Sequence, residues 1–513
     1  MNAPTHQYGE AQEYDVVVIG SGLGGLACAT ILAHEGYNVC VLERNKQIGG
    51  ALQTFVRDRV IFDSGVHYVG GLDPGQNLYQ LFQFLGIMDK LRIKRMDAEV
   101  FDAIAFEGDP VTYKYAQGYE AFIVGLLENF PEEEMAIRAY CGKIRSICDH
   151  FPLYNLRMGD PAEKDPILAI DTATYLDSIT QNIKLKNVLA ATNMLYAGEA
   201  DKTPLYVHAL IINSYIESSY RFVDGGSQIA KYLAREITQS GGKVLKRIEV
   251  IRIVEADGKI THIETAAGHV FKAKTFICNM HPKQMLDLLH NDSLRPAYKH
   301  RINSLENSTS TFCLNIVMKP NSFAYLQHNY YYFKEEDVWG DRQYDEDSWP
   351  LSYAMYFPIS RNTKTHAEGV SVMAYMNIAE LSAWENTYNT VAHEGERGES
   401  YHAFKKRKAE KLIKLIEVRF PGFSNCIQSY SVFTPLTIRD YIGSDDGSLY
   451  GIMQDYKDPI KTFVSAKTKI PNLLLTGQNL NLHGILGVTM SAIVTCAEIL
   501  GMEYLLGKIH ESQ

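Results

Sequence analysis

One glycine-rich turn, Gly20-Ser21-Gly22-Leu23-Gly24-Gly25, constrains the fold of this chain more than any other feature. It follows YDVVVIG, a β-branched apolar run of strand length, and it opens SGLGGLACATILAHEGY, whose small and apolar residues suit a helix packed tightly on a sheet. A further strand-like run, NVCVLE, comes next. The order strand, glycine-rich turn, helix, strand predicts a βαβ unit and therefore an α/β fold on a parallel sheet.

The glycine spacing within this turn fits the dinucleotide-binding pattern G-x-G-x-x-G. Gly20 permits the tight turn, Gly22 lets the backbone approach a pyrophosphate, and Gly25 lets helix and strand pack closely. Glu43 ends the next strand, where a carboxylate accepts ribose hydroxyls. A glycine-rich turn without a ligand is the alternative, but the strand, the helix and the acidic residue together argue against it. We therefore predict dinucleotide contacts at Gly20, Gly22, Gly24, Gly25 and Glu43.

A second glycine pair, Gly49-Gly50, follows Glu43 in the run ERNKQIGGA. This arrangement resembles the extended fingerprint of flavoproteins with the amine-oxidase fold. The resemblance implies FAD as the cofactor, with Arg44, Gly49, Gly50 and Ala51 beside it. Ala51 departs from the family pattern, since many amine oxidases carry Arg at that position. No second G-x-G-x-x-G occurs in the sequence, so a separate NAD(P)H domain is not indicated.

The C-terminal run TGQN, residues 476–479, precedes a helix predicted from Leu486. It resembles the closing motif of the same flavoproteins, in which a loop and a helix N-terminus approach the flavin. A helix N-terminus stabilises the anion that forms when flavin is reduced. The resemblance therefore implies cofactor contacts at Gly477, Gln478, Gly487 and Val488.

The middle of the chain holds a third matching segment. Gly225-Gly226 precedes a predicted helix at residues 227–239 and a predicted strand at residues 243–256. In the family the backbone of this strand contacts the adenine, which implies a cofactor contact at Val250.

These segments define the predicted architecture. We expect a Rossmann-like FAD-binding domain built from the discontinuous residues 1–75, 220–292 and 460–513. The remaining residues, 76–219 and 293–459, are predicted to form an α+β substrate-binding domain. Its region from about residue 115 to 219 is mostly helical by pattern and is expected to act as a lid. The whole resembles the architecture shared by amine oxidases and GDP-dissociation inhibitors.

The segment FDSGVHYVGG, residues 62–71, narrows the family resemblance to one branch. It resembles the retinol saturase, carotenoid isomerase and phytoene desaturase branch, which implies that it lies beside the flavin. His67 titrates near neutrality and Tyr68 can donate a proton, so both are candidate catalytic residues. The alternative for His67 is a hydrogen bond to loop backbone. Asp63 is expected to cap the turn through backbone N–H groups.

Composition excludes several classes of function. The net charge of −10 argues against a nucleic-acid partner. The eight cysteines form no C-x-x-C pair, so we expect no metal site and an intracellular, cytoplasmic protein. No apolar run is long enough to span a membrane. The predicted helix at residues 404–420 is basic and amphipathic; it suits either a solvated surface or peripheral contact with an acidic membrane.

The resemblance implies an FAD-dependent oxidoreductase acting on C=C bonds of a long apolar isoprenoid or polyene, a retinoid or carotenoid. Saturation is the first expectation; carotenoid isomerisation or phytoene-type desaturation is the alternative, and a non-catalytic prenyl-chain escort is the alternative of another class. Such an enzyme needs an external electron donor or acceptor and an apolar tunnel that excludes water. The aromatic run NYYYF at residues 329–333 suits a tunnel wall or, more simply, a core strand.

Overall fold

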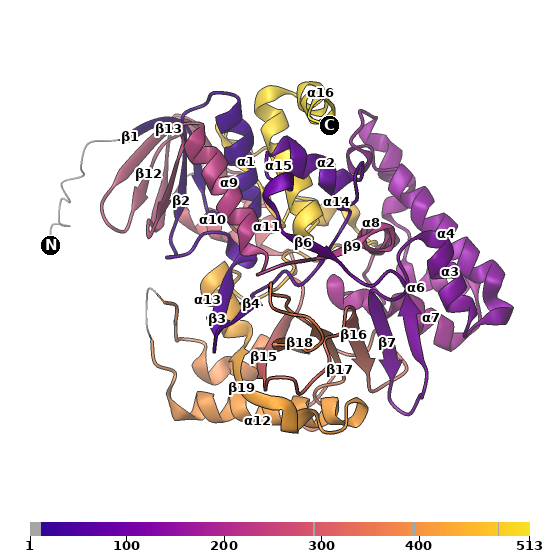
Figure 1. Cartoon of the computed structure of the whole chain (residues 1–513). Helices are drawn as coiled ribbons and strands as arrows, with labels where there is room; N and C mark the ends of the chain where they lie inside the picture. Colours follow the sequence, from indigo (N-terminus) through magenta and orange to yellow (C-terminus); the bar gives the residue numbers. More distant parts are fainter. Residues whose placement is uncertain (1–11, 291–292, 392–394, 481) are drawn as a thin grey trace.

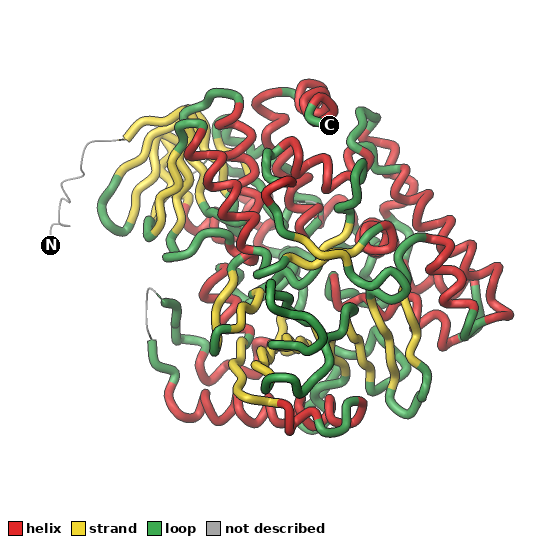
Figure 2. The backbone as a smooth tube through the Cα atoms, in the orientation of Figure 1, coloured by secondary structure: helices red, strands yellow, loops and turns green. Residues whose placement is uncertain are grey.

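Two β-sheets and a group of helices make up the structure, a computed structural model that describes residues 12–290, 293–391, 395–480 and 482–513. Figure 1 shows one sheet at the upper left and the other below it, with α3 (Tyr119–Leu127), α4 (Glu134–Asp149), α6 (Thr172–Ile179) and α7 (Ile183–Ala190) at the right. Figure 2, with strands in yellow and helices in red, shows the same division into strand-rich and helix-rich parts.

The first sheet has the strand order β10-β2-β1-β13-β12-β11-β14, and β20 also pairs with β13. β10, β2, β1, β13 and β20 run parallel, as the βαβ pattern predicts. On one face, α1 (Leu23–His34), α9 (Ser227–Gln239) and α15 (Gly484–Leu500) form a continuous core with the central strands. The strands are β1 (Gln12–Ile19), β2 (Val39–Glu43), β10 (Lys243–Lys246), β11 (Val250–Ala256), β12 (Lys259–Thr265), β13 (Val270–Cys278), β14 (Leu289–His290) and β20 (Leu473–Leu475).

The single strand predicted at residues 243–256 is wrong. Arg247 adopts a left-handed backbone with φ of 59°, which interrupts extended structure because side-chain-bearing residues rarely take this conformation in a strand. β10 therefore ends before Arg247 and pairs with β2, while β11 begins at Val250 and pairs with β12. The C-terminal helix, predicted from Leu486, begins two residues earlier, at Gly484.

The second sheet has the order β19-β15-β18-β17-β16-β7-β8. α12 (Gly398–Arg419) covers one face, where Phe404, Leu412 and Ile416 join its core. The apolar side of this basic helix thus packs on protein. The strands are β7 (Asp102–Phe106), β8 (Thr112–Tyr115), β15 (Ser310–Met318), β16 (Asn329–Phe333), β17 (Ser352–Tyr356), β18 (Gly369–Met376) and β19 (Ile427–Phe433).

The predicted helical region packs on the opposite face of this sheet. Side chains alternate along a strand, so Tyr330 and Tyr332 of β16 face α12, whereas Tyr331 and Phe333 face α4 and α8 (Leu205–Glu217). All five residues of β16 are buried, so this aromatic run forms core on both faces.

Short elements connect the two sheets. β5 (Val69–Gly70), β9 (Ser219–Phe222) and β6 (Ile93–Arg95) form a small sheet, and β3 (Thr54–Arg57) pairs with β4 (Val60–Asp63). The remaining helices are α2 (Asn77–Phe84), α5 (Asp165–Leu168), α10 (Pro282–Leu288), α11 (Pro296–Asn303), α13 (Pro435–Ile442), α14 (Pro459–Thr462) and α16 (Met502–Glu511).

The predicted fold class, α/β with a parallel sheet assembled from distant segments and a second α+β part, is confirmed. The exact domain boundaries stay a prediction. Within the described ranges, every helix is too short or too polar to cross a lipid bilayer.

Candidate functional site

The phosphate-loop candidate lies between β1 and α1. Gly20 has φ of 97°, and a Cβ atom at Gly25 would lie 2.1 Å from the Gly20 carbonyl oxygen, so neither position admits a side chain without distortion. With its amide oxygen turned toward the loop, Asn279 at the end of β13 accepts the N–H groups of Gly22 and Gly25 at 3.2 and 3.3 Å. The N–H groups of Leu23 and Gly24 lack intrahelical acceptors in this first turn, which suits an anionic ligand.

Glu43 organises this loop directly. Its Oε2 accepts the N–H and the hydroxyl of Ser21 at 3.1 and 2.6 Å, and its Oε1 accepts the N–H of Asn45 at 2.7 Å. A carboxylate has about four acceptor positions, so the protein already fills three. Ribose binding through both hydroxyls requires Glu43 to release one of these contacts.

The second glycine pair touches the first turn. Gly49 has φ of 111° and donates its N–H to the Ser21 carbonyl at 3.0 Å. A Cβ atom at Gly50 would lie 3.2 Å from the Cα of Gly22. Ala51, the next residue, packs closely against Gly65: a Cβ atom at Gly65 would lie 3.1 Å from the carbonyl oxygen of Ala51. The chain thus brings the FDSGVHY segment next to the glycine turns.

The C-terminal motif reaches the same place from β20. Gly477 has φ of 101°, and a Cβ atom at Gly24 would lie 2.9 Å from the Gly477 Cα. The α15 N-terminus folds back on the preceding loop, since a Cβ atom at Gly487 would lie 2.6 Å from the Leu482 carbonyl oxygen. Val488 follows in the same helix and is half-buried. The glycines near both ends of the chain therefore form one cradle that is too narrow for side chains.

Two predicted cofactor residues lie at its margin. Arg44 donates through Nη2 to the carbonyl of Asp440 at 3.0 Å, so it binds the α13 segment. Val250 begins β11 two residues after Ile248, whose N–H donates to the Glu43 carbonyl at 2.8 Å. That bond holds the segment just before β11 against the end of β2.

Asp63 binds a different loop from the one expected. Its Oδ1 accepts the N–H of Gly226 at 2.7 Å, and so ties β4 to the turn that precedes α9. Burial raises the pKa of this carboxyl to about 7. The predicted backbone-capping role is correct in kind, but the capped turn lies far along the chain.

His67 packs face to face with Tyr356 of β17, with ring centroids 4.4 Å apart and an angle of 7°. Burial and the nearby Arg221 guanidinium lower the pKa of His67 to about 4. The imidazole is therefore neutral near pH 7. The contact between His67 and Tyr356 is therefore a stack of two aromatic rings.

Tyr68 joins a buried polar cluster. Its hydroxyl donates to Asp102 Oδ2 at 2.9 Å and lies 2.9 Å from the hydroxyl of Tyr331, while its ring stacks on Tyr215 at 4.4 Å. Burial and the Asp102 carboxylate hold the pKa of Tyr68 well above its usual range. Sequence reasoning missed Asp102; its one signal is a carboxylate inside the apolar run VFDAIAF.

A small cavity lies beside the C-terminal motif. Gln478 and His483 line it together with Tyr196 and Tyr450, and its volume of about 20 Å³ has room for one water. The His483 Nε2–H donates to the Leu195 carbonyl at 2.9 Å. His483 was also missed, although it follows TGQN closely. An apolar tunnel of polyene length is not formed by this cavity and stays a prediction.

The described residues contain no group of three or more His, Cys, Asp or Glu side chains placed to hold a metal ion. The cradle instead has features that suit an anionic dinucleotide: glycine backbone leaves room for close approach, a helix N-terminus favours an anion, and the Glu43 carboxylate lies beside the loop.

Comparisons with known proteins agree with this geometry. The family model described as flavin containing amine oxidoreductase matches residues 23–500. All-trans-retinol 13,14-reductase from Homo sapiens is 27% identical over 537 residues, covering 95% of this chain and 86% of its own length. Prolycopene isomerase 2, chloroplastic, from an Oncidium hybrid cultivar is 27% identical over 464 residues, covering 86% and 76%.

A solved structure shares the fold. Cyclohexylamine oxidase from Brevibacterium oxydans IH-35A superposes with a TM-score of 0.59 at 14% identity, covering 97% of this chain and 99% of its own. The predicted amine-oxidase-like architecture is confirmed by this likeness.

Proposed function

The chain belongs to the flavin containing amine oxidoreductase family, and from this we propose that it is an FAD-dependent double-bond reductase of a long apolar isoprenoid or polyene. The chain is a flavin oxidoreductase. We further propose that its flavin is FAD, that its substrate is an apolar polyene, and that the residues described above form the site. Its main support is the single cradle formed by Gly22, Gly24, Gly50 and Gly477, with the FDSGVHY segment directly beside it.

Each part of the cradle has one proposed task. The turn at residues 20–25 holds the pyrophosphate, Glu43 the ribose, and the strand at Val250 the adenine. The second pair, Gly49-Gly50, and the motif at residues 476–479 approach the flavin end, where the α15 N-terminus favours negative charge. When bound and reduced by the external donor, FAD would supply a hydride to one carbon of the double bond.

The other carbon needs a proton, for which the protein offers Tyr68 Oη. Its hydroxyl is hydrogen-bonded to Asp102 and to Tyr331, so a proton that leaves it is replaced within the cluster. His67 is neutral and stacks on Tyr356. It stays a candidate residue of the site, and its proposed task is to orient the substrate. Buried aromatic surfaces around the cluster exclude water and suit an apolar chain.

Isomerisation is the second candidate function, because the prolycopene isomerase relative has the same 27% identity to this chain as the retinol reductase, although over fewer residues. An isomerase needs the reduced flavin but transfers no net hydride. A non-catalytic escort is disfavoured by the intact phosphate loop, Glu43 and the second glycine pair, since a prenyl-chain carrier has no use for a dinucleotide cradle.

Location and partners complete the proposal. We infer a cytoplasmic protein that takes electrons from an external donor and meets its apolar substrate at a membrane surface. The apolar side of α12 is buried in the core, so the surface contact has to come from another element or from the exposed basic side chains of α12.

The experiment is anaerobic. One sample of the purified protein is denatured, and the released flavin is identified. FAD is expected, and a colourless protein contradicts the proposal.

A second sample, kept folded with its flavin bound, is photoreduced and mixed with retinoids and carotenoids. Reoxidation of the flavin by a polyene supports saturation, isomer change without net reoxidation supports isomerisation, and reduction of the oxidised enzyme by substrate supports desaturation.

A further inference from the structure

Asp102 is a fully buried carboxylate, and among the residues that the structure describes no cation is bonded to it directly. It begins β7 in the second sheet. Its Oδ2 accepts the Tyr68 hydroxyl at 2.9 Å, and its Oδ1 accepts Asn329 Nδ2 at 2.8 Å. An isolated buried carboxylate is costly, so its protonated form is favoured here. Burial raises the pKa of Asp102 to about 7, against the lowering effect of its hydrogen bonds and of Arg221.

The nearest cation is already engaged. Arg221 of β9 donates through Nη2 to Asn329 Oδ1 at 3.0 Å and through Nη1 to the Leu326 carbonyl at 2.8 Å. It thus reaches Asp102 only through the amide of Asn329. The ionisable groups that face Asp102 from the packed elements are Tyr68, Tyr115 of β8, Tyr215 of α8, Arg221, Tyr331 of β16 and Tyr356 of β17.

The cluster of Tyr68, Asp102, Asn329 and Tyr331 extends toward the rest of the FDSGVHY segment. The Tyr68 hydroxyl lies 2.9 Å from that of Tyr331, which lies 3.5 Å from that of Tyr356. Tyr356 in turn stacks on His67. A continuous row of hydroxyls therefore joins Asp102 to the residues proposed to border the substrate, and hydroxyl groups both donate and accept protons.

We propose that Asp102 is the proton store of this site and restores Tyr68 after each turnover. The inference rests on the proposed function. When Asp102 is protonated, its Oδ2–H donates to the Tyr68 oxygen across the same 2.9 Å contact, and the Tyr68 hydrogen is free to point toward the substrate. In the step, the Tyr68 O–H bond breaks as a C–H bond forms at the second substrate carbon, and the carboxyl proton of Asp102 moves to the Tyr68 oxygen. The carboxylate of Asp102 then takes a proton from water. The hydride and its electron pair come from flavin reduced by the external donor, so atoms and charges balance.

Asp102 acts through Tyr68 and is a positioning residue, so its test needs a readout beyond activity. Infrared spectroscopy of the resting protein follows the C=O band of protonated carboxyls with pH. We expect a band that disappears with a midpoint near pH 7 and is absent in Asp102→Asn. The matched control is Asp341→Asn, a second buried carboxyl whose pKa burial raises to about 8; it should remove a different band.

Activity then shows the link to catalysis. Wild-type saturation should fall as pH rises through about 7, because the carboxyl form is lost. In Asp102→Asn, saturation should fall roughly 10²-fold at pH 6 and lose this pH dependence, with flavin content unchanged. Asp341→Asn should keep the wild-type profile. A wild-type profile in Asp102→Asn, or no carboxyl band titrating near pH 7, overturns the proposal.

Tyr68→Phe keeps the test sharp if Asp102→Asn fails to fold. The Tyr68 hydrogen bond lowers the pKa of Asp102, so its loss should move the midpoint of the band to higher pH. An unmoved midpoint breaks the proposed coupling and overturns it. If wild-type protein saturates no polyene, the proposed function fails, while the infrared titration still decides whether Asp102 holds a proton linked to Tyr68.

Discussion

Gly24 lies where loops from the two ends of the chain touch. A methyl group there would meet Gly477 Cα at 2.9 Å and the side-chain amide of Asn279 at 2.8 Å, both closer than non-bonded heavy atoms pack. Gly24→Ala should therefore push the closing motif away from the phosphate loop. We expect loss of bound flavin and a decrease of about 1–3 kcal/mol in unfolding free energy, measured by absorbance and denaturant titration.

Gly142→Ala is the matched control. Gly142 lies exposed within α4 with no atom within 4 Å of its virtual Cβ, so alanine should stabilise the helix by about 0.5–1 kcal/mol. Flavin content should stay unchanged. A Gly24→Ala protein with full flavin would contradict the cradle.

His67 gives a second prediction at the residue scale. Because its imidazole is neutral near pH 7, we expect its ring to matter more than its proton. His67→Ala should reduce turnover, and His67→Phe, which keeps the stack on Tyr356, should restore most of it. Turnover is measured on protein with matched flavin content. If phenylalanine fails to rescue alanine, the ring nitrogens carry the role and His67 becomes the stronger proton donor.

At the scale of elements, α12 depends on one buried cation. Lys408 is fully buried, with Nζ 2.9 Å from Glu346 and 2.5 Å from Glu380, and it lies over the ring of Trp349. Lys408→Ala should lower the unfolding free energy by about 2–3 kcal/mol, because Glu380 loses its counter-charge, Glu346 keeps only Arg407 and Lys411, and the stem loses its packing.

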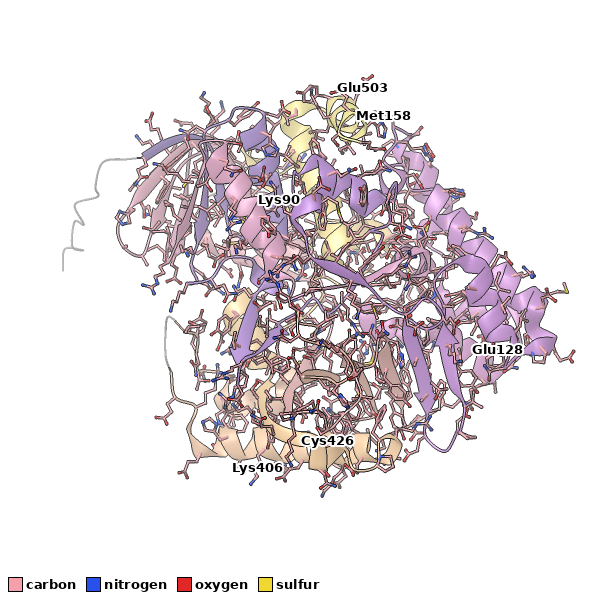
Figure 3. The ribbon with its side chains drawn as sticks, in the orientation of Figure 1. Lys90, Glu128, Met158, Lys406, Cys426 and Glu503 are labelled. Atoms are coloured by element: carbon pink, nitrogen blue, oxygen red, sulfur yellow. The ribbon has the colours of Figure 1, made fainter. Side chains whose placement is uncertain are left out.

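Lys406 provides the comparison on the same helix. It projects from α12 away from the second sheet (Figure 3) and only approaches Glu410 at 3.9 Å. Lys406→Ala should change the unfolding free energy by less than about 0.5 kcal/mol. Equal effects of the two substitutions in denaturant unfolding would refute the anchoring role of Lys408.

Elements with short-range signals were predictable from the sequence. The apolar run before Gly20 and the glycine after it determine β1 and α1, and α9 has the bounds 227–239 that its pattern indicates. The break at Arg247 was not predictable, because its left-handed backbone serves the different pairings of β10 and β11.

Long-range contacts account for the rest. Tyr68 precedes β5 of the small sheet and Asp102 begins β7 of the second sheet, so their hydrogen bond joins two separate sheets and no local pattern indicates it. Asn329 and Tyr331 reach the same cluster from more than 200 residues away. The sequence therefore indicated through family motifs which glycines come together, whereas the cluster of Tyr68, Asp102, Asn329 and Tyr331 required the three-dimensional pairing.

Across the whole molecule, buried ionisable groups set opposing trends in stability with pH. Burial raises the pKa of the Asp63, Asp102 and Asp341 carboxyls to about 7 or 8, so between the unfolded value near 4 and the native value the folded state holds the extra proton, and stability falls as pH rises. Burial lowers the pKa of His67, His208, His328 and His483 to about 4, so their contribution is present above about pH 6.5 and is lost as pH falls toward 4. The pKa of Glu217 is raised and that of His281 lowered by the same cause.

From pH 6.5 to 8 the carboxyls dominate this balance. We expect the unfolding free energy to decrease over that window, and to decrease less in Asp341→Asn, which removes the group with the highest of the three values. Denaturant titrations at the two pH values measure the slope. A wild-type slope in the variant would mean that Asp341 titrates normally in the folded protein.

The central claim is that the molecule uses its flavin to saturate a carbon–carbon double bond. The most direct measurement is an anaerobic single turnover of photoreduced holoprotein with all-trans-retinol or a carotenoid, followed by mass spectrometry of the product. We expect a product two hydrogens heavier than the substrate, in an amount equal to the flavin reoxidised. Flavin that stays reduced beside a polyene of unchanged mass would contradict it.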